Sequence, residues 1–252
     1  RLATLLAMLL VLTGPANSQK LVEHPAQCRV AEHLVESVFP LPHVAVGIAA
    51  KKLNVLVLGA GSSLLRGANG VHEAYPARLQ RALAEQLPGV EVNVATDVKP
   101  KRTAAEMVKA LPAALAAVKP NLVVWQTGTA DAIQAIDSDQ FSQALDRGIN
   151  ISRAASADVV FINPQYSPRT ESMIALGTYT ENMRWVAVQQ EVPLFVRFSV
   201  MKLWADLWTF DFYSATKKLD MAERVHDCIG RLLADLVIEA SKPSEPHAEG
   251  GR

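Results

Sequence analysis

The sequence lacks several features that mark proteins acting on nucleic acids, membranes or metals. Its basic and acidic residues number 25 each, so no excess of positive charge favours nucleic acid or an anionic membrane surface. Only two cysteines occur in 252 residues, Cys28 and Cys228, and this separation fits no metal-binding spacing. The apolar run at residues 2–12 is about half as long as a membrane-spanning helix, which needs roughly 20 residues.

The N-terminal residues have the pattern of a signal peptide. Arg1 precedes the apolar run, and Ala16-Asn17-Ser18 supplies small residues at a cleavage site. Residues 1–18 are therefore predicted to be removed, and we expect an exported protein, periplasmic or secreted. In an oxidising compartment the two cysteines are expected to form a disulfide that joins the N-terminal segment to the last helix.

Regular alternation of strands and helices predicts the fold class. Apolar runs at 55–58, 90–94, 122–125, 159–162 and 194–198 are expected strands, and helical patterns cover 75–87, 103–118, 141–155, 179–190 and 221–240. Strands that are apolar on both faces indicate an α/β fold, a three-layer αβα sandwich around a mostly parallel five-stranded sheet. We expect an N-terminal segment (19–52) packing on one domain (53–240), followed by a disordered tail (241–252).

A glycine- and serine-rich turn follows the first expected strand. Gly59 and Gly61 begin like the dinucleotide fingerprint, but Leu64 stands in the third glycine position and no acidic residue closes the second strand. The turn also lacks the Gly-Lys-Ser/Thr of a phosphate-binding loop. A second interpretation is a nucleophile turn that presents Ser62 or Ser63 at the carboxyl end of the sheet.

The order of motifs along the chain resembles the SGNH (GDSL-type) hydrolases. Gly61-Ser62-Ser63-Leu64 looks like their G-D-S-L motif, residues 75–79 continue the match, and residues 119–129 resemble K-P-D-L-V-x-x-x-x-G-T. Residues 165–169, 192–195 and 227–228 look like an exported branch of these proteins. The resemblance implies hydrolysis of an ester or O-acyl group by a serine, without metal or organic cofactor. Its substrate would be a small-molecule ester or an acylated glycan or lipid.

Several catalytic positions depart from the family pattern. If Ser63 is the nucleophile, Ser62 replaces the usual aspartate; aligning on Gly59 instead puts Gly61 in the serine position. The second motif should supply a glycine, but residues 93–100 contain none. Ala130 replaces the asparagine whose amide helps to bind the oxyanion, and losing one such donor typically costs 10²–10³-fold in rate.

The general base of the resembled family is also replaced. Its D-x-x-H motif falls on Lys217 and Asp220, or on Asp211 and Ser214, and neither pair contains histidine. The remaining candidate is His226, which has Glu223 three residues before it. Residues at this spacing on a helix are surface neighbours, so the pair fits either a triad Ser63–His226–Glu223 or an ordinary helix surface.

Other residues near the expected strand ends are candidate ligand contacts. Lys99, Lys101 and Arg102 suit an anionic ligand, whereas Trp204 and Trp208 would share a helical face if residues 199–208 are helical. Two hypotheses remain open: a serine esterase, or a scaffold that has lost catalysis and binds an acylated glycan, a lipid or a protein partner. The predicted binding residues are Gly61, Ser62, Gly128, Thr129, Asp131 and Arg169.

Overall fold

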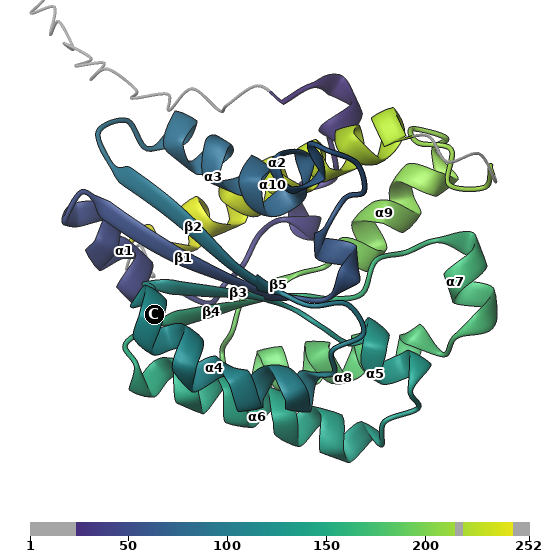
Figure 1. Ribbon diagram of the computed structural model, residues 1–252. Coiled ribbons are helices and arrows are strands. Elements are labelled where there is room, and N and C mark those ends of the chain that lie inside the picture. Colours follow the sequence, from purple (N-terminus) through teal and green to yellow (C-terminus); the bar gives the residue numbers. More distant parts are fainter. Residues whose placement is uncertain (1–23, 215–218, 244–252) are drawn as a thin grey trace, which may run out of the picture.

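A computed structural model describes residues 24–214 and 219–243, and it confirms the predicted fold class (Figure 1). Five strands form one sheet in the order β2-β1-β3-β4-β5, and every neighbouring pair is parallel. The strands are β1 (Lys52–Gly59), β2 (Glu91–Val98), β3 (Leu122–Gln126), β4 (Asp158–Ile162) and β5 (Leu194–Phe195).

Helices cover both faces of the sheet, which explains why the central strands are apolar throughout. One apolar core lies beneath α1 (Pro42–Ala49), α3 (Tyr75–Gln86), α9 (Arg197–Asp206) and α10 (Leu219–Ala240). A second core lies on the opposite face, against α4 (Ala104–Val118), α6 (Ser138–Ala154) and α8 (Leu176–Gln189). Figure 1 shows these two helical layers above and below the sheet.

Short helices fill the connections between these elements. The α-helical ones are α2 (Gly70–Glu73), α5 (Thr129–Ile133) and α7 (Pro168–Met173), and the 3₁₀ turns are η1 (Ala26–Cys28), η2 (Glu32–Leu34) and η3 (Gly61–Ser63). The turn η3 and the helices α5 and α7 follow the ends of strands β1, β3 and β4. They therefore occupy the edge of the sheet where α/β proteins bind ligands.

The strand predicted at 194–198 is shorter than the apolar run suggested. Strand β5 ends at Phe195, and α9 begins two residues later at Arg197. Helix α9 ends at Asp206, so Trp204 and Trp208 do not share a helical face: Trp204 is buried in the core and Trp208 is exposed. The apolar run continues across the boundary between β5 and α9, so no local pattern marks where the strand ends.

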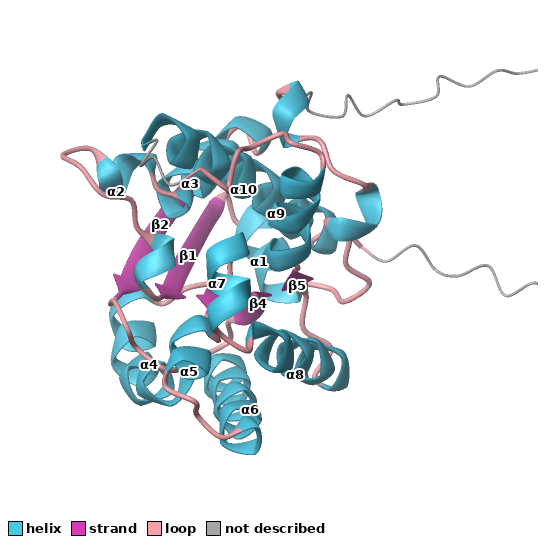
Figure 2. Ribbon diagram, turned by 90° about the vertical axis from the view of Figure 1, so that its right-hand side faces the viewer, coloured by secondary structure: helices cyan, strands magenta, loops and turns pink. Residues whose placement is uncertain are grey.

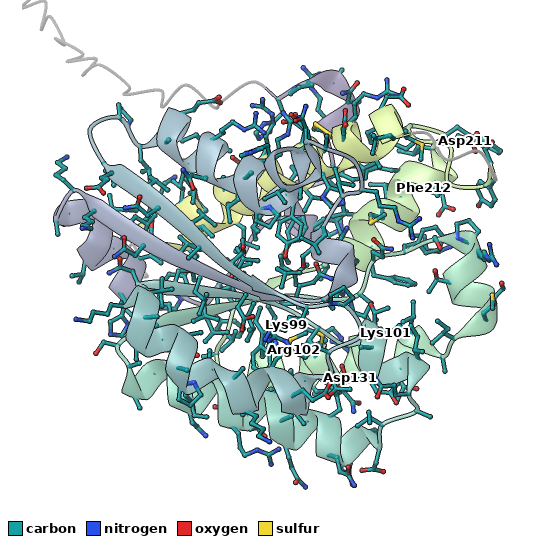
Figure 3. The ribbon with its side chains drawn as sticks, in the orientation of Figure 1. Lys99, Lys101, Arg102, Asp131, Asp211 and Phe212 are labelled. Atoms are coloured by element: carbon teal, nitrogen blue, oxygen red, sulfur yellow. A yellow bond between two sulfur atoms is a disulfide. The ribbon has the colours of Figure 1, made fainter. Side chains whose placement is uncertain are left out.

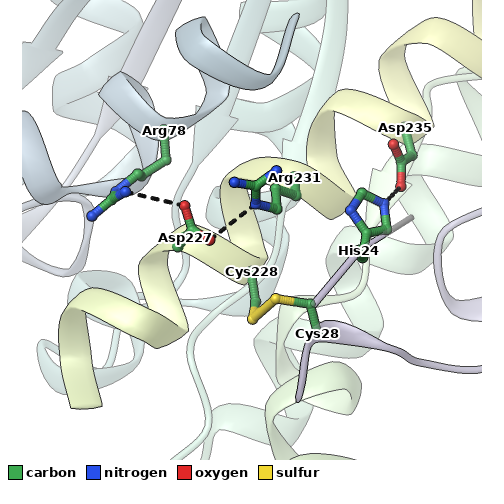
Figure 4. Close-up of a disulfide and its surroundings, with 7 residues drawn as sticks. All are labelled: His24, Cys28, Arg78, Asp227, Cys228, Arg231 and Asp235. Carbon is green, nitrogen blue, oxygen red and sulfur yellow. Dashed lines mark hydrogen bonds and ion pairs between the residues drawn. A yellow bond between two sulfur atoms is a disulfide. The ribbon is translucent and has the colours of Figure 1, made fainter. Parts of the chain in front are cut away.

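The N-terminal segment is fastened to α10, as Figure 4 shows. Cys28 and Cys228 form the predicted disulfide, and His24 hydrogen-bonds Asp235 further along the same helix. The backbone N–H of Leu41 also donates to the carbonyl of Ala240, at 2.8 Å. The expected signal peptide and most of the expected tail lie outside the described residues. Within the described ranges, no helix has the length and apolar character needed to cross a bilayer.

Candidate functional site

The candidate site lies where the parallel strands end, on the side of the molecule that faces the viewer in Figure 2. Strand β1 runs into η3, whose three residues differ in accessibility: Gly61 is exposed, Ser62 is half-buried and Ser63 is fully buried. Gly59 must lack a side chain here, because a Cβ atom on it would overlap the Ser63 hydroxyl. Within this turn, the Ser63 hydroxyl therefore lies against the strand, and Gly61 lies at the surface.

Gln126, the last residue of β3, binds both serine side chains. Its Oε1 atom accepts a hydrogen bond from the Ser63 hydroxyl at 2.6 Å, and its Nε2 atom donates to the Ser62 hydroxyl. The Tyr75 hydroxyl lies 3.1 Å from Ser63 Oγ. Because the Ser63 proton is directed to Gln126, Tyr75 acts as the donor in this second contact. Both serine hydroxyls are therefore held by hydrogen bonds within the protein.

Arg197, the first residue of α9, fixes the orientation of the Gln126 amide. Its guanidinium donates to Gln126 Oε1 at 3.1 Å, to the carbonyl of Ser62 at 3.2 Å and to Gln165 Oε1 at 3.2 Å. Arg197 is completely buried, and the hydrogen bonds of its guanidinium to described residues all go to uncharged oxygens. Burial lowers its pKa to about 10, so the side chain remains charged at neutral pH.

Tyr75 separates the serines from His226. The tyrosine ring lies below the Arg197 guanidinium, with 5.7 Å between the guanidinium carbon and the ring centroid, and burial raises the pKa of Tyr75 to about 12. On the other side, the backbone N–H of Tyr75 donates to His226 Nδ1 at 2.9 Å. Within the described residues, no hydrogen bond connects His226 to either serine or to Glu223.

The environment of His226 disfavours its charged form. Burial, helped by the positive charges of Arg197 and Arg78, lowers the pKa of His226 to about 3. A general base in ester hydrolysis must accept a proton during the reaction, and its pKa is best placed near the working pH. An imidazole in this position is a neutral hydrogen-bond acceptor that caps the start of α3.

The turn after β3 brings together three of the predicted binding residues. Gly128 has a φ of 95°, which glycine adopts readily, and it is the residue just before α5. Thr129 begins the helix, and its hydroxyl is buried without a hydrogen-bond partner in the described structure. Asp131 is buried, and its carboxylate accepts from the backbone N–H groups of Ala104 (2.9 Å) and Gly128 (3.3 Å). Asp131 therefore ties α4 to this turn. Burial raises the pKa of Asp131, an effect opposed by these hydrogen bonds.

The predicted basic residues lie at the same edge. Figure 3 shows Lys99, Lys101 and Arg102 close to Asp131, beneath the sheet in that view. Arg102 is buried, and its guanidinium donates hydrogen bonds to the Asp97 carboxylate at 3.0 and 3.1 Å. Lys99 and Lys101 are exposed. Arg169, in α7, is also exposed. Lys99, Lys101 and Arg169 are thus cations that solvent can reach at this edge.

The positions expected to supply a base hold no imidazole. Asp211 accepts from the backbone N–H of Tyr213 (3.1 Å) and of Ser214 (3.0 Å), which closes a local turn. Asp220 lies in the first turn of α10, 3.9 Å from Arg224, and Lys217 lies outside the described residues. Nor do the described residues contain a group of three or more His, Cys, Asp or Glu side chains able to hold a metal ion.

Sequence reasoning missed the three residues that organise the site: Tyr75, Gln126 and Arg197. The predicted strand 122–125 ends one residue before Gln126, and Tyr75 begins the predicted helix 75–87. Both residues lie in stretches that resemble the family, but the sequence assigned neither of them a role in binding a hydroxyl. Arg197 had a usable signal, because a single arginine stands within the apolar run 194–198. A charged residue in a buried strand is expected to serve a hydrogen-bonding network.

The five-stranded parallel sheet, covered by helices on both faces and with a serine turn after its first strand, has the architecture of SGNH-type hydrolases. The model of the non-GDSL lipase-like family matches residues 27–243, and the chain belongs to this family. Comparison with curated proteins found no match.

Solved structures of hydrolases share the fold. TesA is 23% identical with a TM-score of 0.56, covering 72% of this chain and 99% of its own. A lipase/acylhydrolase from Enterococcus faecalis is 19% identical with a TM-score of 0.60, and the match covers 77% of this chain and 100% of that one. A catalytic mutant of Axe2, an acetylxylan esterase from Geobacillus stearothermophilus, is 14% identical with a TM-score of 0.59, covering 76% and 96%. At identities this low the likeness shows a common fold only, so any activity has to be inferred from the residues of this chain.

Proposed function

We propose that this protein is an exported member of its family that has lost ester hydrolysis and binds an acylated carbohydrate at the strand-end site. The main support for the loss of hydrolysis comes from the hydrogen bonds of Gln126 to the two serines. One amide, oriented by Arg197, engages both serine hydroxyls of the turn. A serine attacks an acyl carbonyl only when a base removes its proton, and an amide oxygen is far too weak a base for that role.

The groups around the turn support the same conclusion. His226 is engaged by the backbone of Tyr75, and its low pKa leaves it a poor proton acceptor. The most exposed residue of the turn is Gly61, which has no hydroxyl at all. Ala130 cannot supply the amide that the resembled hydrolases use to bind the oxyanion, so transition-state stabilisation is weakened together with the nucleophile.

Export and the type of ligand rest on separate observations. The disulfide between Cys28 and Cys228 fits an oxidising compartment. Hydrolases of the same fold include an acetylxylan esterase, whose substrate is an acylated glycan. A scaffold that keeps the fold and loses the nucleophile can retain recognition of such a ligand, because binding and bond cleavage depend on different groups. We expect the exported product to begin after Ser18, as N-terminal sequencing would show.

A fluorophosphonate probe tests the loss of catalysis, because it reacts with an activated serine whatever the natural substrate is. The purified chain, shown to be folded by circular dichroism, is treated with the probe, and adducts are mapped by mass spectrometry. An active serine esterase treated in parallel is the positive control. We expect no adduct on Ser62 or Ser63.

Variants then assign any labelling that occurs. An adduct on either serine contradicts the proposal, and its disappearance in His226→Ala and Glu223→Gln would instead establish the triad Ser63–His226–Glu223 that the sequence suggested. Substitution of each serine by alanine identifies the reactive one. Tyr75→Phe is the matched test of whether the tyrosine hydroxyl contributes to that reactivity.

A further inference from the structure

An exposed pair of aromatic rings lies beyond the end of α9. Trp208 is 72% exposed and Tyr213 is 53% exposed, and their rings stack at a centroid distance of 5.5 Å with 30° between their planes. Most of the Trp208 side chain remains open to solvent beside this contact. Large aromatic side chains are normally buried, so an exposed stacked pair indicates a binding surface.

The backbone of Trp208 adds a second, independent observation. Its φ is 55°, and among the described non-glycine residues with positive φ it is the only aromatic one. Trp208 terminates α9: its N–H donates to the carbonyl of Ala205 at 3.1 Å, and the N–H of Thr209 donates to that of Trp204 at 2.9 Å. Glycine is preferred at this left-handed position because a Cβ atom crowds the following carbonyl. Because Trp208 is both strained and exposed, packing does not account for a tryptophan at this position.

The stacked pair lies near the loop that leads from β4 to the strand-end site. Asp211, labelled in Figure 3 beyond α9, accepts a hydrogen bond from the backbone N–H of Tyr213. Burial, with a smaller contribution from the neighbouring Tyr213, raises the pKa of Tyr166 to about 12. Tyr166 follows β4 and is adjacent in the chain to Gln165, which accepts a hydrogen bond from Arg197. One loop after β4 thus has Tyr213 as a neighbour and contacts the network around the serine turn.

The chemistry of the pair selects a class of ligand. The face of an aromatic ring carries partial negative charge, which suits the C–H groups on the flat side of a pyranose. On α9, Lys202 and Asp206 lie 3.9 Å apart and offset each other, so this described ion pair adds no net charge beside the rings. The rings of tryptophan and tyrosine therefore fit an uncharged sugar ring.

We propose that Trp208 and Tyr213 form a carbohydrate-stacking platform that binds a neutral glycan extending from the strand-end site. This inference rests on the proposed function, since it names the part of the protein that would recognise the sugar. The platform needs no serine chemistry, so it can be tested whether or not the turn is reactive.

Affinity electrophoresis of the purified chain, with its disulfide intact, tests the platform. The probes are soluble neutral glycans: acetylated xylan, unmodified xylan, glucomannan and a soluble chitin derivative. We expect retardation by at least one of them, and a loss of affinity of roughly tenfold or more in Trp208→Ala and in Trp208→Gly. Trp185→Ala is the matched control, because Trp185 is 58% exposed on α8, in the opposite helical layer; its removal should leave binding unchanged.

The same two variants separate a ligand-binding role from a structural one. Both lack the indole, but glycine relieves the left-handed strain that alanine retains. Trp208→Gly should therefore melt about 2–4 °C above Trp208→Ala, while both variants bind glycan equally poorly. A merely structural tryptophan would show no glycan affinity in the unmodified chain.

Other results would overturn the platform. The platform is refuted if none of the glycans retards the unmodified chain. It is also refuted if a glycan retards the Trp208→Ala variant as strongly as the unmodified chain. Sedimentation with phosphatidylcholine vesicles, lost on substitution of Trp208, would assign the pair to a lipid surface. A dimer in analytical ultracentrifugation that Trp208→Ala dissociates would assign it to a second copy of the chain. Labelling of a serine by fluorophosphonate bears on catalysis and not on this surface, so the two proposals fail separately.

Discussion

Arg197 donates a hydrogen bond to the side-chain oxygen of Gln126, and this contact of 3.1 Å determines what the serine turn can do. With Oε1 directed to the guanidinium, the amide must present Nε2 to Ser62, which it does. The same oxygen takes the proton of Ser63. A buried arginine thus orients the amide that holds both hydroxyls in place, and under the proposed function it does so without activating them.

Arg197→Lys is expected to destabilise the fold although it keeps the charge. A lysine ammonium cannot span the carbonyl of Ser62 and the side chains of Gln126 and Gln165 together, so buried acceptors lose their donors. We expect a loss of about 2–4 kcal/mol in the free energy of unfolding, measured by urea denaturation. Arg169→Lys, on the exposed surface, is the control and should change this quantity by less than about 0.5 kcal/mol. An equally small effect at Arg197 would show that its contacts do not hold the turn.

Two glycines of the serine turn should respond differently to the same substitution. A Cβ atom at Gly59 overlaps the Ser63 side chain, whereas one at Gly61 meets Pro100 only at an ordinary 3.8 Å. Gly59→Ala should therefore cost about 1–3 kcal/mol of stability through overpacking. Gly61→Ala should stay within about 0.5 kcal/mol of the unmodified chain. Similar thermal unfolding midpoints for the two variants would contradict this geometry of η3.

The buried imidazole of His226 predicts a specific acid sensitivity. Its pKa is about 3 in the folded protein and about 6.5 when unfolded, so the unfolded chain binds the extra proton between these values. Stability from the neutral imidazole is complete above pH 6.5 and declines as the pH falls towards 3, by up to about 1.4 kcal/mol per pH unit.

His226→Asn isolates this effect. The asparagine oxygen can replace Nδ1 as acceptor for the Tyr75 N–H but does not titrate. Urea midpoints measured from about pH 7.5 to about pH 4, a range that spans most of this decline, should fall less steeply in this variant than in the unmodified chain. His72→Asn, at an exposed position, should leave the slope unchanged. Parallel curves for all three proteins would mean that His226 is not buried in its neutral form.

Loss of the disulfide is expected to cost about 2–4 kcal/mol. Cys28 and Cys228 are 200 residues apart, so the bond restricts a very long loop in the unfolded chain. The double variant Cys28→Ala/Cys228→Ala should have a lower urea midpoint, and the reduced unmodified chain should match it. Equal midpoints for the oxidised and reduced chains would show that the hydrogen bonds of the N-terminal segment to α10 suffice.

The architecture was predictable because it depends on patterns that the chain carries locally. Strands β1, β3 and β4 are apolar on both faces, and the intervening helices have the matching periodicity, so a covered parallel sheet follows. The exception was the end of β5. Phe195 and Phe198 are both apolar, yet α9 begins between them, because Arg197 turns inward to the serine turn rather than extending the strand.

The site was only partly predictable, for a different physical reason. The turn at residues 59–63 has a local signature, but its chemistry depends on partners brought from β3, α3 and α9. Which partner meets Ser63 is decided by packing between distant elements, and no spacing in the sequence encodes it. Trp208 illustrates the same limit: a periodic pattern places it beside Trp204, whereas the end of α9 turns it out to solvent.

The bond between the two cysteines also changes what proteolysis can accomplish. It closes a covalent ring that contains all five strands and most of the helices. A protease that cuts the chain once, anywhere between Cys28 and Cys228, opens the ring but releases nothing, because both fragments stay attached through sulfur. In the oxidising surroundings that this protein is proposed to inhabit, a surface loop could be nicked while the sheet and its binding edge remain in one piece.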